Sequence, residues 1–220
     1  MLGFLRHPDL QSKVNLMPST LYYIHDPMCS WCWGQRPLWD ELRSRLPDGV
    51  VVEYVAGGLA SDSGAPMPMV LQRAIQGYWR EISEKLGTEF NFDFWTKNTP
   101  RRSTYIACRA VIAAKNQGAE IEMIDAIQRA YYLRAMNPSD SDVLIMLAAE
   151  LSLDVDLFSR ELESPATHQA LQRQIALARE LTQQGFPSMV LEHEGARHSL
   201  VREYQDCGRV LDELISTINR

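Results

Sequence analysis

The sequence predicts an α/β protein in which a βαβ unit and a ββα unit flank a block of helices. Three observations support this fold class. An apolar run at 19–27 is followed by helical spacing and then by a second apolar run. Residues 64–163 show helical periodicity, and the chain closes with two short apolar runs and an amphipathic helix. We therefore expect one sheet domain in two parts, 19–63 and 164–220, interrupted by an inserted helical domain, 64–163.

The βαβ unit begins with a strand at 19–27 that is rich in aromatic and β-branched residues and ends at Pro27. Apolar side chains then recur at helical spacing over 30–46, and the breaker residues 47–49 stop that helix. A second strand is expected at 50–58. Because a helix connects the two strands, they should pair in parallel.

The inserted block follows a cluster of breaker residues at 61–68. Five helices are expected in it, at about 69–86, 103–117, 120–136, 140–151 and 155–162. Ser139 or Asp140 is the expected N-cap of the fourth helix. No low-complexity linker bounds the block, so we expect it to pack against the sheet domain.

The last segment supplies the ββα unit. A helix over about 166–183 should end at Gly185, a residue type that favours helix C-termini. Two short apolar runs at 188–193 and 197–201 are separated by a turn containing Gly195, which predicts a hairpin. An amphipathic helix over 204–219 closes the chain.

Composition excludes several classes of function. The 220 residues include 22 basic and 28 acidic side chains, a formal charge of -6, so nucleic acid and anionic lipid are not expected partners. No apolar stretch approaches the roughly 20 residues of a membrane span. Arg6, Pro8 and Asp9 interrupt the region where a signal peptide would need an apolar core, so we expect a cytoplasmic location.

Cys29 and Cys32 are the strongest chemical signal, in the sequence Met-Cys-Ser-Trp-Cys-Trp-Gly. Their spacing at the start of the expected helix puts both sulfurs on one face, within reach of a disulfide. The N–H groups and the dipole at that helix end favour a thiolate on Cys29. We therefore predict that Cys29 is a nucleophile and that Cys32 resolves the mixed disulfide it forms.

Two other interpretations of the cysteine pair are a zinc site and simple core packing. A zinc site would need two further ligands, and Cys108, Cys207 and His25 are the candidates, but none has partner spacing. The strand-to-helix context favours redox chemistry over both, and no metal is expected.

With these motifs in place, the sequence resembles thioredoxin-fold proteins of the DsbA family. Pro37 lies five residues after Cys32, where thioredoxins similarly carry a proline in the active-site helix. Three further segments, STYIACRAV, NPSDSDVL and GFPS, resemble DsbA-like or FrnE-like disulfide isomerases. The resemblance implies a thioredoxin fold whose helical block is the DsbA-type insertion. It extends to 2-hydroxychromene-2-carboxylate isomerases and kappa-class glutathione transferases.

The resemblance also implies the substrate-binding residues. Members of this fold place a cis-proline opposite the cysteine pair, and Pro187 falls at that position. Phe186 would then offer its backbone N–H and C=O to an extended substrate. Ser30 and Trp31, between the cysteines, would contact the same substrate, with Trp31 forming an apolar lip. Trp33 and Trp39 are expected in the core.

Proton transfer is less clearly indicated. Relatives often carry a buried acid six residues before the first cysteine, where this sequence has Tyr23. Asp26 and His25 are the candidate substitutes, although a solvated Asp26 that caps the helix is the simpler expectation. The pair Ser30-Trp31 also lacks the histidine of strongly oxidising relatives, so the protein should be a weaker oxidant.

The leading hypothesis is a cytoplasmic thiol–disulfide oxidoreductase that reduces or isomerises disulfides in proteins or peptides. No bound cofactor is expected, and glutathione is a candidate reductant or cosubstrate. One alternative is a glutathione-dependent isomerase or transferase of the two related enzyme classes, although these carry serine at the nucleophile position. Another is a redox-switched peptide-binding chaperone. The sequence assigns no role to Cys108 or Cys207.

Overall fold

The computed structural model describes residues 19–220, and in this part of the chain it forms a mixed four-stranded sheet in the order β2-β1-β3-β4. Arg6, Pro8 and Asp9, on which the expected cytoplasmic location depends, lie outside the described residues. The strands are β1 (Ser19–His25), β2 (Val50–Ala56), β3 (Ser188–His193) and β4 (Ala196–Ser199). β1 and β2 are parallel, as expected from their helical connection, and β3 is antiparallel to both of its neighbours.

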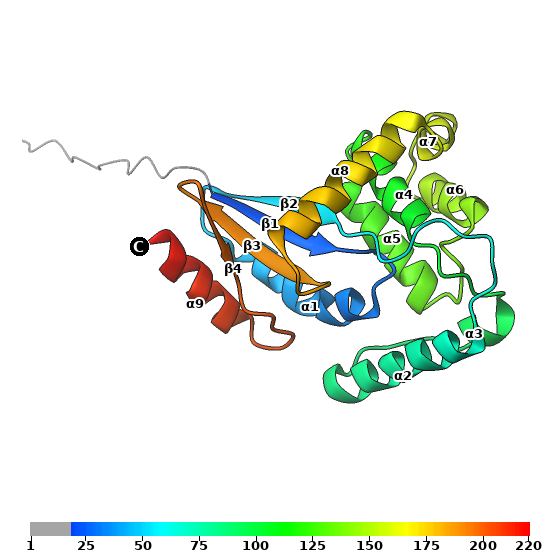
Figure 1. Ribbon diagram of the computed structural model, residues 1–220, viewed down its shortest axis with the longest axis horizontal. Coiled ribbons are helices and arrows are strands. Elements are labelled where there is room, and N and C mark those ends of the chain that lie inside the picture. Colours follow the sequence, from blue (N-terminus) through cyan, green and yellow to red (C-terminus); the bar gives the residue numbers. More distant parts are fainter. Residues whose placement is uncertain (1–18) are drawn as a thin grey trace, which may run out of the picture.

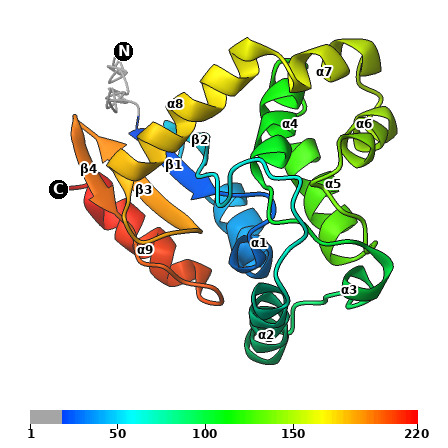
Figure 2. The ribbon, with the colours of Figure 1, turned by 45° about the vertical axis from the view of Figure 1, so that its right-hand side comes forward.

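Helices cover both faces of the sheet. In chain order they are α1 (Ser30–Ser44), α2 (Met69–Leu86), α3 (Phe94–Lys97), α4 (Tyr105–Lys115), α5 (Glu120–Tyr132), α6 (Ser141–Glu150), α7 (Val155–Leu162), α8 (Pro165–Leu181) and α9 (Cys207–Ile218). Figures 1 and 2 show α1 and α9 on one face of the sheet and α8 on the other, with α2 to α7 grouped beyond one end. The predicted thioredoxin fold with a helical insertion is confirmed.

Alternation along β1 explains why both faces need helices. Leu21 and Tyr23 belong to the large core that includes α1 and α9. Ile24 points the other way and packs with Ala178 and Leu181 of α8. A strand that is apolar on both faces is stable only between two layers, and the sequence of β1 has that character.

Most helix bounds agree with the sequence pattern, and two details do not. α3 was not predicted, because four residues are too short to show a helical period; it forms where Phe94 packs against Trp79. α8 ends at Leu181 with Thr182 extended, so Gly185 is not its C-cap. Gly185 instead lies in the following loop with a positive φ of 77°.

The β3–β4 hairpin has the predicted turn. Glu194 and Gly195 both have positive φ, at 51° and 78°. Two consecutive left-handed residues give the turn the twist that the flanking strands need.

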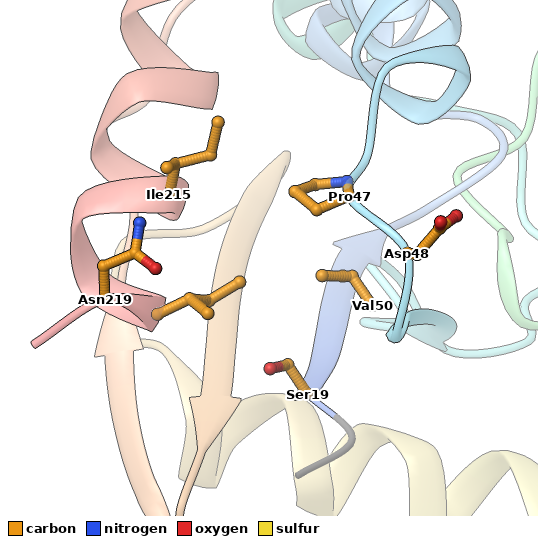
Figure 3. A pocket seen from close by; sticks show the side chains of 7 residues that line it. Ser19, Pro47, Asp48, Val50, Ile215 and Asn219 are labelled. Carbon is orange, nitrogen blue, oxygen red and sulfur yellow. The ribbon is translucent and has the colours of Figure 1, made fainter. Parts of the chain in front are cut away.

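One apolar cavity lies far from the cysteines. It has a volume of about 240 Å³, and Pro47, Val50 and Ile215 face one another across it (Figure 3). Ser19, the first residue of β1, also lines this cavity, whereas Cys29 follows the last residue of β1. The cavity is therefore at the opposite end of the strand from the cysteine pair. Within residues 19–220, none of the helices has the length and apolar character to cross a membrane.

Candidate dithiol active site

Cys29 lies where the chain passes from β1 to α1, and it is the N-cap residue of that helix. Its backbone N–H donates to the carbonyl of Asp26 at 2.9 Å, and its carbonyl accepts from Trp33 N–H at 3.1 Å. Cys29 is 7% exposed and Cys32, one turn further into the helix, is 1% exposed. Both are free thiols. The more accessible sulfur is therefore the one at the helix end.

Electrostatics separates the two thiols in the same sense. Hydrogen bonding from the Cys32 thiol is the largest influence on Cys29 and lowers its pKa, and backbone amides of Cys32 and Trp31 act in the same direction. Burial and the charge of Asp26 oppose this shift. The pKa of Cys32 is raised well above its ordinary value, mainly by burial. Cys29 is thus the better thiolate and Cys32 keeps its proton.

The loop before β3 faces Cys29 because of strand register. Ile24, near the end of β1, pairs with Ser188, the first residue of the antiparallel β3. The residues that precede β3 must therefore lie beside the residues that follow β1. The Phe186–Pro187 peptide bond is cis, and the Cys29 thiol donates to the Phe186 carbonyl at 3.7 Å.

Gly57 shapes the side of this loop, and the sequence analysis did not identify it. A Cβ at position 57 would lie 2.0 Å from the Phe186 ring, so only glycine permits the ring to pack there. Gly57 N–H also donates to the carbonyl of His25 at 2.7 Å. A cavity of about 240 Å³ opens next to Phe186, between the residues after β2 and Arg179 and Thr182 of the α8 end. The sequence feature that could have indicated this role of Gly57 is the pair Gly57-Gly58 at the end of the strand expected at 50–58.

The tryptophans near the pair differ in burial. Trp31 is half-buried and its ring lies 5.3 Å from that of Tyr204, a contact that the sequence analysis missed. Trp39 is buried and stacks on Tyr23 at 3.9 Å, in agreement with the expected core position. Trp33 is only half-buried and stacks on the ring of a buried tyrosine of α5. Ser30, the first residue of α1, is half-buried beside Cys29.

Asp26 is not the solvated helix cap that the sequence favoured. Its side chain is fully buried, and Oδ1 accepts from Met28 N–H at 2.8 Å. Oδ2 accepts from Leu59 N–H at 2.8 Å and from the Thr104 hydroxyl at 2.7 Å. The Cys108 thiol lies 3.5 Å from the same oxygen. Burial raises the pKa of Asp26, and these hydrogen bonds oppose the rise.

His25 is also buried, which removes it from acid–base chemistry near neutral pH. Its ring stacks on Tyr23 and meets the edge of Tyr54, and Nδ1 has no hydrogen-bond partner within residues 19–220. Burial lowers the pKa of His25 to about 3. The neutral ring cannot donate a proton as an imidazolium would, so the geometry favours Asp26 over His25.

The other cysteines lie in different surroundings. Cys207 begins α9 and sits beside Glu41 and Arg45, at the opposite end of α1 from Cys29. Cys108 is in α4. In the part of the chain that the structure describes, no three His, Cys, Asp or Glu side chains are grouped so that they could hold a metal ion.

Comparison with known proteins identifies the family. A family model described as Thioredoxin matches residues 22–206, which include both cysteines and the cis-proline. The chain belongs to the thioredoxin family. Its resemblance to DsbA-family proteins is confirmed by similar solved structures.

Two of these structures are similar across almost the whole chain. One is a crystal structure from Nitrosomonas europaea, of a protein provisionally assigned as a protein disulfide isomerase. It has 26% identity and a TM-score of 0.78, and the match covers 91% of this chain and 97% of that chain. The second is the cytosolic disulfide reductase DsbM from Pseudomonas aeruginosa, with 27% identity and a TM-score of 0.70 over 91% and 95% of the two chains.

Curated relatives carry a different name. The ClpXP adapter protein SpxH of Halalkalibacterium halodurans is 23% identical over 94% of this chain, and that of Bacillus subtilis is 27% identical over 74%. The matches span 71% and 55% of the lengths of these two relatives. Proteins similar to this chain therefore include one named as a reductase and others named as adapters.

Proposed function

We propose that this protein is a cytoplasmic thiol–disulfide oxidoreductase that reduces or isomerises disulfides of proteins or peptides. One observation carries the proposal. The more exposed and more acidic thiol, Cys29, lies 3.7 Å from the carbonyl of Phe186 and one helical turn from the buried Cys32. This arrangement combines a nucleophile, a resolving thiol and a backbone segment that can hold an extended substrate.

The reaction proceeds in two exchanges. The Cys29 thiolate attacks one sulfur of the substrate disulfide, the S–S bond breaks, and the other substrate sulfur leaves as a thiolate. Cys32 then loses its proton and attacks Cys29, which releases the second substrate thiolate and leaves a Cys29–Cys32 disulfide. In isomerisation, a substrate thiolate attacks the mixed disulfide instead, and the protein is returned in its reduced form.

Substrate binding would use the backbone of Phe186. Its carbonyl accepts from the Cys29 thiol in the free protein, and this acceptor is released when Cys29 becomes a thiolate or a mixed disulfide. An extended peptide can then pair with it by strand addition. The Trp31–Tyr204 pair and the cavity beside Phe186 would contact side chains of that peptide.

The proton of Cys32 needs an acceptor, since burial raises the pKa of that thiol. Asp26 is the buried carboxyl that acts on both Cys29 and Cys32 electrostatically. We assign proton transfer to Asp26, with the proton returning to the departing substrate thiolate.

The direction of electron flow is expected to be reductive. The residues between the cysteines, Ser30 and Trp31, supply no positive charge to stabilise the thiolate strongly, so the reduced form is not strongly favoured. The similar protein DsbM is named a cytosolic disulfide reductase, and its structure with GSH is also similar to this chain, with a TM-score of 0.69. Glutathione, as a thiol reductant, could reduce the Cys29–Cys32 disulfide and complete the cycle.

Two single substitutions test the proposal. Cys29→Ser should abolish reduction of insulin disulfides in a glutathione-coupled assay, because no nucleophile remains. Cys32→Ser should accumulate mixed disulfides, visible as a mass increase that a strong reductant removes. Cys207→Ser is the matched control and should retain activity. Equal activity in the Cys29 and Cys32 variants would reject the mechanism.

A second candidate function rests on the SpxH relatives, which are named ClpXP adapter proteins. As an adapter, this protein would bind partner proteins without turnover. The double variant Cys29→Ser/Cys32→Ser distinguishes the two functions. An adapter should retain binding to purified ClpXP in a sedimentation or interferometry assay, whereas an oxidoreductase loses its activity in this variant.

A further inference from the structure

The Asp26 carboxyl joins three segments that are distant in sequence. Its Oδ1 accepts a hydrogen bond from the N–H of Met28, in the loop that leads to Cys29. Its Oδ2 accepts from the N–H of Leu59, which follows β2. The same oxygen accepts from the hydroxyl of Thr104, at the start of α4 in the helical insertion. Asp26 is 0% exposed and Thr104 1% exposed, so water does not compete for these contacts. A residue of the active-site loop is therefore bonded directly to the insertion.

Cys108 makes a second contact from the same helix. It follows Thr104 by one turn, so both side chains lie on one face of α4. Its thiol is fully buried, and Asp26 Oδ2, at 3.5 Å, is its one hydrogen-bond acceptor within residues 19–220. Its other neighbours are apolar side chains of α4, α8 and β2. The thiol hydrogen therefore points to Asp26, while the backbone amide of Gly58 acts on the sulfur and lowers the pKa of the thiol.

Thr104 can reverse its hydrogen bond, whereas the backbone donors cannot. The N–H groups of Met28 and Leu59 only donate, so they favour the ionised carboxyl. The Thr104 hydroxyl lies 2.7 Å from Asp26 Oδ2 and 3.4 Å from the carbonyl of Ala60, and it accepts from Ala60 N–H at 3.1 Å. If Asp26 gains a proton on Oδ2, the hydroxyl can turn its hydrogen to Ala60 and accept from Asp26. No buried polar group then loses its partner.

Asp26 also touches both active-site cysteines through its backbone. Its carbonyl accepts from Cys29 N–H at 2.9 Å, and its backbone amide acts on the Cys32 sulfur and lowers the pKa of that thiol. The carboxyl that Thr104 and Cys108 contact therefore belongs to a residue whose backbone adjoins the Cys29 N–H and the Cys32 thiol.

We propose that Thr104 and Cys108 are positioning residues for the dithiol reaction, because they control how the Asp26 carboxyl takes up and returns the proton of Cys32. The inference rests on the proposed oxidoreductase function and extends it to the helical insertion. In this proposal the helical insertion determines the pH range in which the mixed disulfide is resolved.

In the proposed step, Cys32 resolves the mixed disulfide between Cys29 and the substrate. The Cys32 S–H bond breaks and its proton moves to the Asp26 carboxylate. The Cys32 thiolate attacks Cys29 Sγ, a new S–S bond forms, and the bond from Cys29 to the substrate sulfur breaks. The substrate thiolate leaves with the electron pair and receives the proton from Asp26. The protein dithiol is oxidised and the substrate disulfide is reduced.

Other titratable or charged groups also act on Asp26, and all of them except Cys108 are unchanged in the variants below. They come from α1, from α5 and from the segments around α4, and they are Cys29, Cys32, Tyr131, Tyr132, Arg102 and Cys108 itself. Arg102 lowers the pKa of Asp26. The negative charge of Asp26 in turn raises the pKa values of the cysteines and tyrosines. The measured midpoint therefore belongs to the coupled group, and a change between variants reports the altered contact.

The test uses dithiobis(nitrobenzoate) as the disulfide. Cys29 releases one coloured thiolate as it forms the mixed disulfide, and Cys32 releases the second as it resolves it, so stopped-flow absorbance separates the two steps. Thr104→Val removes a donor to the carboxylate and should raise the pH midpoint of the second release by about one unit. Below the midpoint, the second release should then be about tenfold slower. The first release should change less than about twofold.

Conservative variants give the opposite or no effect. Thr104→Ser keeps the hydroxyl and should retain the wild-type midpoint. Cys108→Ser supplies a stronger donor and should lower the midpoint, whereas Cys108→Ala removes a weak donor and should raise it slightly. Thr217→Val is the matched control, because within residues 19–220 the hydroxyl of this buried threonine of α9 donates only to a carbonyl of its own helix.

The outcomes separate the two proposals. If Thr104→Val fails to fold, the opposed shifts of the two Cys108 variants carry the test. If all folded variants retain the wild-type pH midpoint of the second release, the proposed role of Thr104 and Cys108 is wrong, and the proposed oxidoreductase function is unaffected. A wild-type protein that releases no second thiolate would instead reject the proposed function itself.

Discussion

His25 and Asp26 are neighbours in the chain, and burial has different consequences for them. Both side chains are at most 2% exposed. His25 contacts aromatic rings and leaves one ring nitrogen without a partner among the described residues. Asp26 has four donors around its two oxygens. A buried group can exchange a proton only if partners stabilise both of its states, and Asp26 meets this condition better than His25.

The buried histidine predicts a loss of stability in acid. The pKa of His25 is about 3 in the fold against 6.5 for the ordinary side chain. Because the folded value is depressed, the stability from the neutral ring is fully present above pH 6.5 and is lost as the pH falls toward 3. Between pH 6 and 4 this residue should lower the free energy of unfolding by about 1.4 kcal/mol per pH unit.

Urea unfolding at several pH values measures this contribution. His25→Phe keeps an aromatic ring and removes the titration, so its stability should fall less steeply between pH 6 and 4. Above pH 7 the difference between the two proteins should be constant, which is the internal control. Identical slopes for both proteins would mean that the ring is already charged in the fold.

At the scale of elements, the helix N-termini differ in a way that relates to function. Side-chain oxygens of Asp154, Ser164 and Asp206 accept backbone N–H groups at the starts of α7, α8 and α9. α1 has Cys29 at the same position and no side-chain cap bond among the described residues, and α2 to α6 lack such a bond as well. The first N–H groups of α1 therefore stay free to stabilise the Cys29 thiolate. What distinguishes α1 is that a cysteine, whose thiolate these N–H groups can stabilise, stands at its N-cap position.

Restoring a cap to α1 should increase stability and remove activity. Serine is a strong N-cap residue, so Cys29→Ser should raise the free energy of unfolding by about 0.5 to 1 kcal/mol relative to the reduced wild type. Guanidinium unfolding under reducing conditions measures the change. Cys207→Ser is the control, because α9 already has Asp206 as its cap, and no gain is expected there. A loss of stability on Cys29→Ser would show that the thiol contributes more by packing than a cap would.

At the scale of the whole molecule, the sheet and the insertion share a core. One cluster of buried side chains includes Leu42 of α1, Trp79 of α2 and Val210 of α9. A second cluster joins Ala56 of β2 to Cys108 of α4. The segments 19–63, 64–163 and 164–220, which we propose as domain boundaries from the sequence, are thus connected by continuous apolar contacts as well as by Asp26.

A shared core predicts one cooperative unfolding transition. The five tryptophans lie in both the α1 region and the insertion, so their fluorescence reports both parts, whereas far-UV circular dichroism reports all helices. The two signals should give coincident urea midpoints. Separate midpoints would indicate that the insertion unfolds on its own, and the contacts of Asp26 with α4 would then be too weak to control the dithiol.

Much of the fold followed from the sequence because its signals are local. The helical period, the breaker residues and the hairpin turn each act within a few residues, and they placed α2 and α7 at their observed bounds. The cysteine pair at a strand–helix junction is local in the same sense. α3 escaped prediction because one short turn depends on its packing partners.

The sequence by itself determined the order of elements and the position of Cys29 at a helix start, and its family resemblance supplied the candidate roles of Phe186 and Pro187. Only the tertiary structure decided which side chains surround the dithiol. Thr104 and Cys108 are 78 and 82 residues from Asp26 in the chain, and they meet it because α4 packs against α8 near the end of β2. Burial of Asp26 and His25 has the same origin. Long-range packing removes water from both groups, and no local pattern records which partners replace it.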